Sequence, residues 1–192
     1  MRWIFSLILA TIIFACGNTS IEEASNAENA DSTALDTVNY DADYKATTIM
    51  KVGTTVPDFT LTTLDGELFR LSDQKGKIVF INFFALTCPI CLKELPELEK
   101  QIWQKYKDNT DIVILCIGRE ETKEKLITFR DKKQYTFPIA ADTNRSVYAI
   151  FAEKYIPRNI IIDKDGKLIF SEVGYNEEKF QKLQEEIKKS LN

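Results

Sequence analysis

Residues 78–91 read IVFINFFALTCPIC, and this stretch decides the fold. Its first seven residues form a nearly continuous apolar run, which is typical of a strand buried on both faces. A helix is expected to run from Pro89 to about residue 107, because the N–H that proline lacks would have no partner at the first helical position. A buried strand that leads directly into a helix predicts a layered α/β architecture.

Further strand and helix patterns lie on both sides of this stretch. Before it, Asp65-Gly66 separates two short apolar runs, at residues 59–61 and 67–71, which predicts an N-terminal hairpin. After it we expect a buried strand at 112–117, a polar helix at 122–134, a short strand at 137–140, a helical turn at 146–151, a second hairpin from 160–163 and 168–173, and an amphipathic helix at 177–191. The alternation predicts one α/β domain over residues 51–192.

The two cysteines at the strand–helix junction form a candidate redox pair. Cys88 is expected to cap the helix, where free backbone N–H groups and the helix dipole favour the thiolate and lower the pKa of Cys88. Cys91 shares a 4-3-4 spacing with Leu95, Leu98 and Ile102, so it belongs to the buried stripe of the helix. Cys88 is therefore predicted to be the exposed nucleophile and Cys91 the shielded, resolving thiol.

Two cysteines at this spacing could also bind a metal or form a structural disulfide. A zinc site would need two more ligands, but the chain has no histidine, and Cys116 is expected to lie buried in the strand at 112–117. A purely structural disulfide is conceivable outside the cytoplasm, although a two-residue spacing at a helix start favours a redox pair. The sequence therefore predicts redox chemistry without a metal or a cofactor.

Residues 79–96, from Val79 through CPIC to Pro96, strongly resemble the TlpA/ResA-like branch of the thioredoxin superfamily, within the AhpC/TSA–redoxin-like group. The resemblance continues at residues 57–59 (PDF), 155–157 (YIP) and 160–167 (IIIDKDGK). It implies a thioredoxin-like fold, with a central mixed sheet flanked by helices, an N-terminal hairpin and an insertion before a cis proline. It also implies a thiol–disulfide oxidoreductase with a redox-active Cys88–Cys91 disulfide.

The same resemblance implies roles for residues around the cysteines. Pro157 matches the cis proline of the family, and Ile156 before it stands where contact with substrate is shaped. Glu94 matches an acidic residue thought to assist the proton transfers of the second cysteine. Pro89 and Arg158 adjoin this surface and complete the predicted substrate-binding set. For Arg158, steering of an acidic partner and an ordinary surface arginine without a role in binding are the two interpretations.

Three further positions compare with the family in different ways. Asn82 stands where thioredoxins proper carry a buried Asp, and we expect it to satisfy a hydrogen bond inside its strand. Pro96 matches a proline that kinks the helix. Thr87 departs from the pattern, because the family usually has Trp there, so the resemblance does not fix the shape of the substrate surface.

The first residues are predicted to be a targeting segment. Met1 and Arg2 precede an apolar run at 3–13 that is too short to span a bilayer, which indicates a signal peptide at 1–15. The run ends in a lipobox-like motif, so Cys16 is predicted to be lipidated. An ordinary signal or anchor with an incidental cysteine is the alternative. Residues 17–44 carry seven acidic residues and no Lys or Arg, and 16–50 is predicted to be a disordered acidic linker.

Together these features predict a lipoprotein of the bacterial cell envelope that reduces or exchanges disulfides of exported proteins. A membrane electron-transfer protein would supply electrons, and apocytochromes awaiting haem are candidate clients. A peroxiredoxin is one alternative, although neither cysteine fits its Pro-x-x-x-Thr-x-x-Cys pattern. A dithiol copper carrier is another. The net charge of −4 without a basic cluster argues against nucleic acid.

Overall fold

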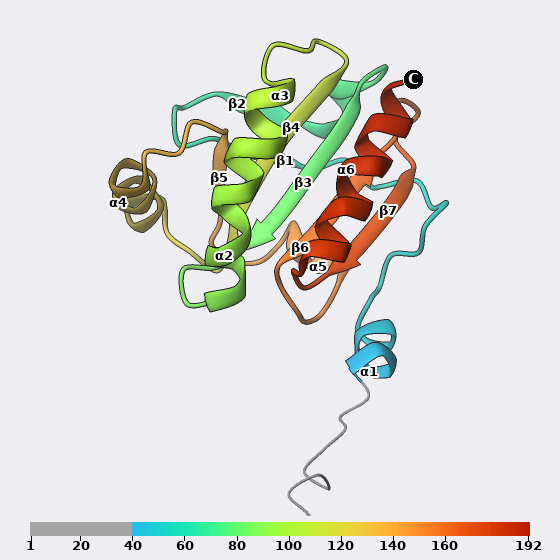
Figure 1. Cartoon of the computed structure of the whole chain (residues 1–192), viewed down its shortest axis with the longest axis horizontal. Coiled ribbons are helices and arrows are strands. Elements are labelled where there is room, and N and C mark those ends of the chain that lie inside the picture. The colour runs from blue at the N-terminus through green and yellow to red at the C-terminus, as the bar shows by residue number, and fades with distance from the viewer. Residues whose placement is uncertain (1–39) are drawn as a thin grey trace, which may run out of the picture. The chain divides into compact units, whose positions relative to one another are not determined.

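The computed structural model describes residues 40–192 (Figure 1). Its elements in chain order are α1 (Tyr40–Ala46), β1 (Thr60–Thr62), β2 (Leu68–Arg70), the 3₁₀ helix η1 (Leu71–Gln74), β3 (Ile78–Phe84), α2 (Pro89–Glu97), the π-helical η2 (Leu98–Trp103), α3 (Gln104–Tyr106), β4 (Ile112–Arg119), α4 (Lys123–Lys133), β5 (Ile139–Asp142), α5 (Tyr148–Phe151), β6 (Arg158–Ile162), β7 (Leu168–Val173) and α6 (Glu177–Leu191). The predicted signal peptide at 1–15, the lipidation of Cys16 and the linker up to residue 39 lie outside the described residues. Among residues 40–192, no helix is both long and apolar enough to cross a bilayer.

β3 lies at the centre of a five-stranded sheet of order β5-β4-β3-β6-β7. It pairs in parallel with β4, which pairs in parallel with β5, whereas β6 runs antiparallel to both β3 and β7. Every residue of β3 is buried, as its apolar run predicts. β1 and β2 form a separate antiparallel hairpin. The mixed sheet and the N-terminal hairpin that the sequence predicts are therefore confirmed.

The two faces of the sheet carry two apolar clusters, because alternate residues of a strand point to opposite sides. On one face, Phe80 and Phe84 of β3 pack with buried residues of α2 and α6. Figure 1 shows these two helices crossing the same face of the sheet. On the other face, Val79, Ile81 and Phe83 pack with α5 and with residues that precede β3. A polar side chain that β3 turns towards α2 therefore lies inside the first cluster.

The helical segment after β3 changes its hydrogen bonding partway along. Pro96 lies inside α2, and a proline removes one helical N–H and crowds the carbonyl four residues before it. The chain then continues with the wider, π-helical turns of η2 and ends in α3. The predicted helix at 89–107 is confirmed in extent, with an irregularity after Pro96.

The folded domain begins earlier than predicted. α1 falls inside the range 16–50 that the sequence assigns to a disordered linker, yet it belongs to the same compact unit as the sheet. The hydroxyl of Tyr44 donates to the carbonyl of Ser171 at 3.2 Å, and the hydroxyl of Tyr155 donates to the carboxylate of Asp43. Composition does not reveal such long-range contacts. The linker prediction is therefore wrong for residues 40–50.

Candidate active site

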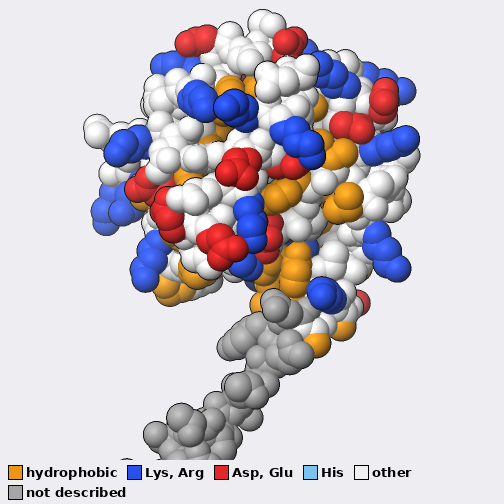
Figure 2. Space-filling view, turned by 45° about the vertical axis from the view of Figure 1, so that its right-hand side comes forward, with side chains coloured by type: hydrophobic (Ala, Val, Ile, Leu, Met, Phe, Trp, Pro, Cys, Tyr) orange, Lys and Arg blue, Asp and Glu red, His pale blue; other side chains and the backbone are white. Residues whose placement is uncertain are grey.

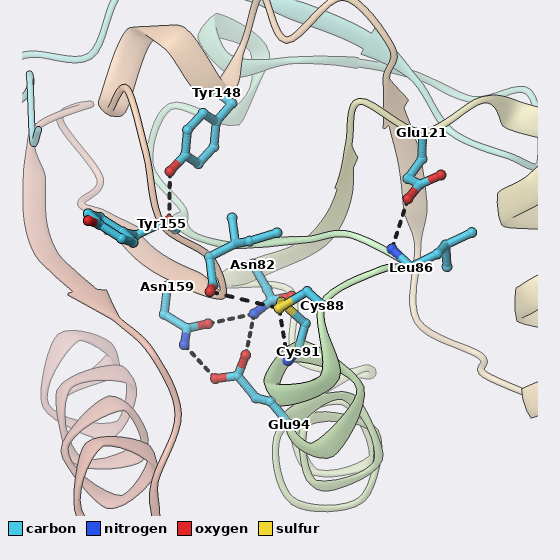
Figure 3. Close-up of a disulfide and its surroundings, with 10 residues drawn as sticks. Asn82, Leu86, Cys88, Cys91, Glu94, Glu121, Tyr148, Tyr155 and Asn159 are labelled. Atoms are coloured by element: carbon cyan, nitrogen blue, oxygen red, sulfur yellow. Dashed lines mark hydrogen bonds between the residues drawn. A yellow bond between two sulfur atoms is a disulfide. The ribbon is translucent and has the colours of Figure 1, made fainter. Parts of the chain in front are cut away.

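The two sulfurs lie at the junction between β3 and α2, as predicted, and they form a disulfide (Figure 3). Cys88 is the N-cap of α2, and its Sγ accepts a hydrogen bond from the backbone N–H of Cys91 at 3.2 Å. Pro89 occupies the first turn, where its missing N–H is tolerated. Cys88 is half-buried, whereas Cys91 is 0 % exposed. One sulfur therefore meets solvent and the other is shielded.

The loop before β6 reaches this disulfide from the other side. The Ile156–Pro157 peptide bond is cis, as the resemblance implies. The carbonyl oxygen of Ile156 lies 3.8 Å from Sγ of Cys88. The hydroxyl of Tyr148 holds the loop, since it lies 2.5 Å and 2.6 Å from the carbonyl oxygens of Lys154 and Tyr155. The structure thus presents the backbone of Ile156 directly beside the sulfur of the half-buried Cys88.

Glu94 lies one helical turn beyond Cys91 and is only 1 % exposed. Its two carboxylate oxygens accept hydrogen bonds from Nδ2 of Asn82 at 2.9 Å and Nδ2 of Asn159 at 2.6 Å. Nδ2 of Asn82 also donates to Oδ1 of Asn159 at 2.9 Å, which closes a three-residue network (Figure 3). Burial raises the pKa of Glu94 from 4.5 to about 7, although both asparagine hydrogen bonds lower it.

The register of the sheet explains how this network forms. Asn82 of β3 and Asn159 of β6 are direct partners in the antiparallel pair, so both side chains point to the face that α2 covers. The expectation that Asn82 is hydrogen-bonded in its strand is confirmed. Asn159 was missed by the sequence analysis. The sequence feature that could have drawn attention to Asn159 is its position as a polar residue next to the three isoleucines at 160–162. Its pairing with Asn82 follows only from the strand register.

A second carboxylate that the sequence analysis missed supports the loop that precedes Cys88. Glu121 is 6 % exposed, and its Oε1 accepts a hydrogen bond from the backbone N–H of Leu86 at 2.9 Å. The backbone oxygen of Glu121 in turn accepts the hydroxyl of Thr143 at 3.0 Å. Glu121 therefore fixes the backbone two residues before the capping cysteine. A glutamate in the polar segment after a strand carries no sequence signal for this contact.

Arg158 does not belong to the substrate surface, which corrects the prediction. Its side chain is 0 % exposed, because β6 is buried on both faces and Arg158 points to the face opposite Asn159. Its guanidinium lies 3.3 Å from the hydroxyls of Thr48 and Ser171 and 3.2 Å from the carbonyl oxygen of Lys154. Arg158 therefore ties the cis-proline loop to the N-terminal segment and cannot steer an acidic partner.

Cys116 lies on β4 opposite Asn82 and is fully buried, as predicted. Burial raises the pKa of its thiol well above the usual value, and the charges of Glu94 and Glu99 add to this effect. Within the part of the chain that the structure describes, no three potential metal ligands of the His, Cys, Asp or Glu type gather in one place. Cys116 therefore forms part of the apolar interior.

A family model described as Redoxin matches residues 51–187, which is most of the chain. The chain belongs to the Redoxin family. Among its relatives, the thiol–disulfide oxidoreductase ResA of Bacillus cereus is 32% identical over 125 residues, which cover 65% of this chain and 71% of that protein. ResA of Bacillus thuringiensis subsp. konkukian is 33% identical over 140 residues, covering 73% of this chain and 79% of the relative.

Solved structures similar to this chain also include thiol–disulfide exchange proteins. A proposed protein disulfide isomerase from Bacteroides thetaiotaomicron is 38% identical with a TM-score of 0.72, covering 76% of this chain and 92% of that one. The exposed lipoprotein thioredoxin Etrx1 of Streptococcus pneumoniae is 28% identical with a TM-score of 0.56, covering 67% and 99%. The protein is thus a ResA/TlpA-like thiol–disulfide oxidoreductase with a thioredoxin-like fold.

Proposed function

We propose that this Redoxin-family protein is a lipid-anchored disulfide reductase of the bacterial cell envelope that works through Cys88 and Cys91. The supporting observation is the asymmetry of the pair: a half-buried sulfur at a helix N-terminus is bonded to a fully buried one beside a cis proline. The first sulfur can be reached by a protein disulfide, and the second can act only from inside. Electron flow in the opposite direction would use the same two sulfurs.

The proposed reaction begins with the reduced protein. The Cys88 thiolate is stabilised by the backbone N–H of Cys91 and by the N-terminal end of the α2 dipole. It attacks one sulfur of a client disulfide, the client S–S bond breaks, and the leaving client thiolate takes a proton. A mixed disulfide between Cys88 and the client remains. The backbone of Ile156, with Pro89 and Pro157 alongside, forms the surface against which the client lies in this intermediate.

The second step resolves the mixed disulfide. The Cys91 thiol loses its proton, and its thiolate attacks Sγ of Cys88. The bond between Cys88 and the client breaks, and the second client sulfur leaves as a thiolate that takes a proton. The client disulfide has then gained two electrons and two protons, and Cys88 and Cys91 are joined.

Glu94 is proposed to accept the proton of Cys91. It lies three residues further along α2, and residues at that spacing are neighbours on one helix face. A general base works best when its pKa lies near the working pH, and burial places the pKa of Glu94 at about 7. The two asparagines hold the carboxylate in place for this role.

The proposed cellular setting rests on the sequence of residues 1–50. A lipid on Cys16 would anchor the domain through the acidic segment, and a membrane electron-transfer protein would reduce the disulfide again. Exported proteins with disulfides, apocytochromes among them, are the proposed clients. The face drawn in Figure 2 carries charges of both signs interspersed with apolar side chains, which suits protein clients better than nucleic acid.

A Cys16→Ser variant is expected to leave the membrane fraction, and a variant that still pellets with membranes would refute the anchor.

The activity is tested by insulin reduction with the reduced full-length protein. With no other reductant present, each wild-type molecule is expected to reduce one insulin disulfide in a single turnover, whereas Cys88→Ala reduces none and Cys91→Ala accumulates mixed disulfides visible on a non-reducing gel. Cys116→Ala is the matched control, because Cys116 is a buried free thiol outside the pair and its loss should leave turnover intact. If Cys88→Ala turns over like wild type, the proposed mechanism fails.

A further inference from the structure

A pocket of about 390 Å³ lies beside the cis-proline loop, between the end of β4 and the start of α5. We call it the arginine pocket. Its lining consists of Arg119 from β4, Arg145 before α5, and Glu153, Lys154, Tyr155 and Ile156 from the loop that leads to the cis proline. Three of these side chains carry a positive charge and one carries a negative charge. The lining therefore favours an anionic ligand.

The positive charges of the arginine pocket are only partly neutralised. Nε of Arg119 lies 3.2 Å from the carboxylate of Glu120, and the two Nη groups of Arg119 make no hydrogen bond with residues 40–192. Arg145 donates to the backbone carbonyl of Glu153, but its buried Nε has no acceptor among the described residues. Neither Arg145 nor Lys154 forms an ion pair within that part of the chain. The pocket thus keeps cationic groups that a ligand can engage.

Both guanidinium groups are held against one aromatic ring. Cζ of Arg119 lies 5.0 Å and Cζ of Arg145 lies 5.4 Å from the centre of the Tyr148 ring, distances at which a cation is attracted to the ring face. The hydroxyl of Tyr148 reaches the backbone of Tyr155 in the cis-proline loop (Figure 3). A side chain that is already held loses little conformational entropy on binding, so these arginines are prepared to bind a carboxylate.

The backbone around the arginine pocket adopts conformations that L-residues rarely take. Four residues other than glycine have a positive φ within the described chain, and one of them, Gln134, ends α4. The other three are Arg145 and Tyr155, which line the pocket, and Glu120, which follows Arg119. Such conformations concentrate at binding and catalytic sites, because the surrounding structure must hold them in place. Their positions here agree with a built site.

Ile156 connects the arginine pocket to the reacting sulfur. It belongs to the lining, and its carbonyl oxygen lies 3.8 Å from Sγ of Cys88. A client joined to Cys88 by a mixed disulfide lies against the same residue, so the neighbours of the client cysteine can reach the pocket. A carboxylate on such a neighbour would accept charge-assisted hydrogen bonds from the Nη groups of Arg119. The occupant that fits both the charge and the location is an acidic side chain of the client.

We propose that the arginine pocket binds a carboxylate that flanks the reacting cysteine of a protein client, and that Arg119 and Arg145 are specificity-determining residues for acidic clients. This inference rests on the proposed disulfide exchange at Cys88. It gives the protein a preference among clients that two cysteines alone do not supply, because a thiolate attacks any disulfide that it can reach.

The test compares two disulfide-linked peptides that differ only in having Glu or Gln on both sides of the cysteine. At low ionic strength, the reduced full-length protein is expected to show a kcat/KM about fivefold higher for the Glu peptide, near the upper end of what a solvent-accessible ion pair contributes. The ratio should fall towards one in roughly 1 M NaCl, where the screening length is about 3 Å. This salt test needs no variant, so it stands even if a substitution prevents folding.

Variants of the two arginines locate the effect. Arg119→Gln should bring the Glu-to-Gln ratio close to one, and the ratio cancels any general loss of activity. Arg145→Glu should reverse the preference and favour a third peptide with Lys at the same positions, which a purely structural role would not cause. Arg130→Gln is the matched control, because its side chain is 21% exposed against 20% for Arg119 and it pairs with Asp65 and Asp131 outside the pocket lining. It should keep the wild-type ratio.

Several results would overturn the role of the arginine pocket. They are equal kcat/KM values for the Glu and Gln peptides in wild type, a ratio that persists at high salt, an unchanged ratio in Arg119→Gln, and an unchanged order of the three peptides in Arg145→Glu. An equal fall of the ratio in Arg130→Gln would also overturn it, since net charge would then be the cause. Failure of wild type to reduce the uncharged hydroxyethyl disulfide would instead overturn the proposed exchange at Cys88, and the pocket proposal with it.

Discussion

Glu94 shows how one buried residue links stability to pH. Its pKa is raised from 4.5 to about 7, so the folded state binds this proton more tightly than the unfolded state does. The protonated form thus stabilises the fold fully below pH 4.5, and this contribution is lost as pH rises through 7. At about 1.4 kcal/mol per pH unit, the total is on the order of 3 kcal/mol.

Replacing Glu94 with Gln should remove this pH dependence. The oxidised Glu94→Gln protein is expected to keep a nearly constant free energy of unfolding between pH 5 and 8, whereas the wild type loses stability over the same range. Urea unfolding at pH 5, 6, 7 and 8 measures the difference. Glu97→Gln is the control, because Glu97 is a less buried carboxylate on the same helix. Parallel curves for wild type and Glu94→Gln would show that the buried carboxyl does not titrate as described.

At the scale of elements, the hydrophobic pattern predicted the bounds of those helices and strands whose limits depend on local packing. The strand at 78–84 has the predicted bounds because its apolar run is nearly continuous. The helix at 177–191 has them because its apolar residues recur at helical spacing and Asn176 caps it. β5 lies two residues later than the predicted 137–140, at Ile139–Asp142. Asp142 ends that strand with its carboxylate accepting the N–H groups of Val147 and Tyr148, a buried polar contact that hydropathy does not signal.

The cap of α6 gives a test at this scale. Asn176 is its N-cap, and Oδ1 of Asn176 accepts the backbone N–H of Lys179 at 2.8 Å. Asn176→Ala is expected to lower the free energy of unfolding by about 1 kcal/mol, since one helical N–H loses its partner. Chemical denaturation measures the change, and insulin reduction should stay at the wild-type level. Asn176→Asp should retain the cap, so an equal loss in both variants would argue against capping as the cause.

At the scale of the whole molecule, the site combines residues that are far apart in the chain. Cys88, Cys91 and Pro157 could be predicted, because each belongs to a short motif that the resemblance makes specific. Asn159 could not, since its contact with Glu94 depends on which strands pair and in which register. The prediction that Arg158 lies on the substrate surface was wrong for the same reason, because one step along β6 moves a side chain to the opposite face. The contact of Tyr44 with Ser171 could not be predicted, because Tyr44 lies in a segment with the composition of a linker.

Reversible formation of the Cys88–Cys91 bond is the chemistry on which all of these roles depend. The full-length protein would be equilibrated with graded ratios of reduced and oxidised dithiothreitol, its free thiols trapped by alkylation, and the modified cysteines identified by mass spectrometry. We expect Cys88 and Cys91 to change together along one two-electron curve, with a tenfold change in the equilibrium ratio for every ~30 mV, while Cys116 stays unmodified in the folded protein. Independent titration of Cys88 and Cys91, or a pair that never closes at any ratio, would contradict the proposed mechanism.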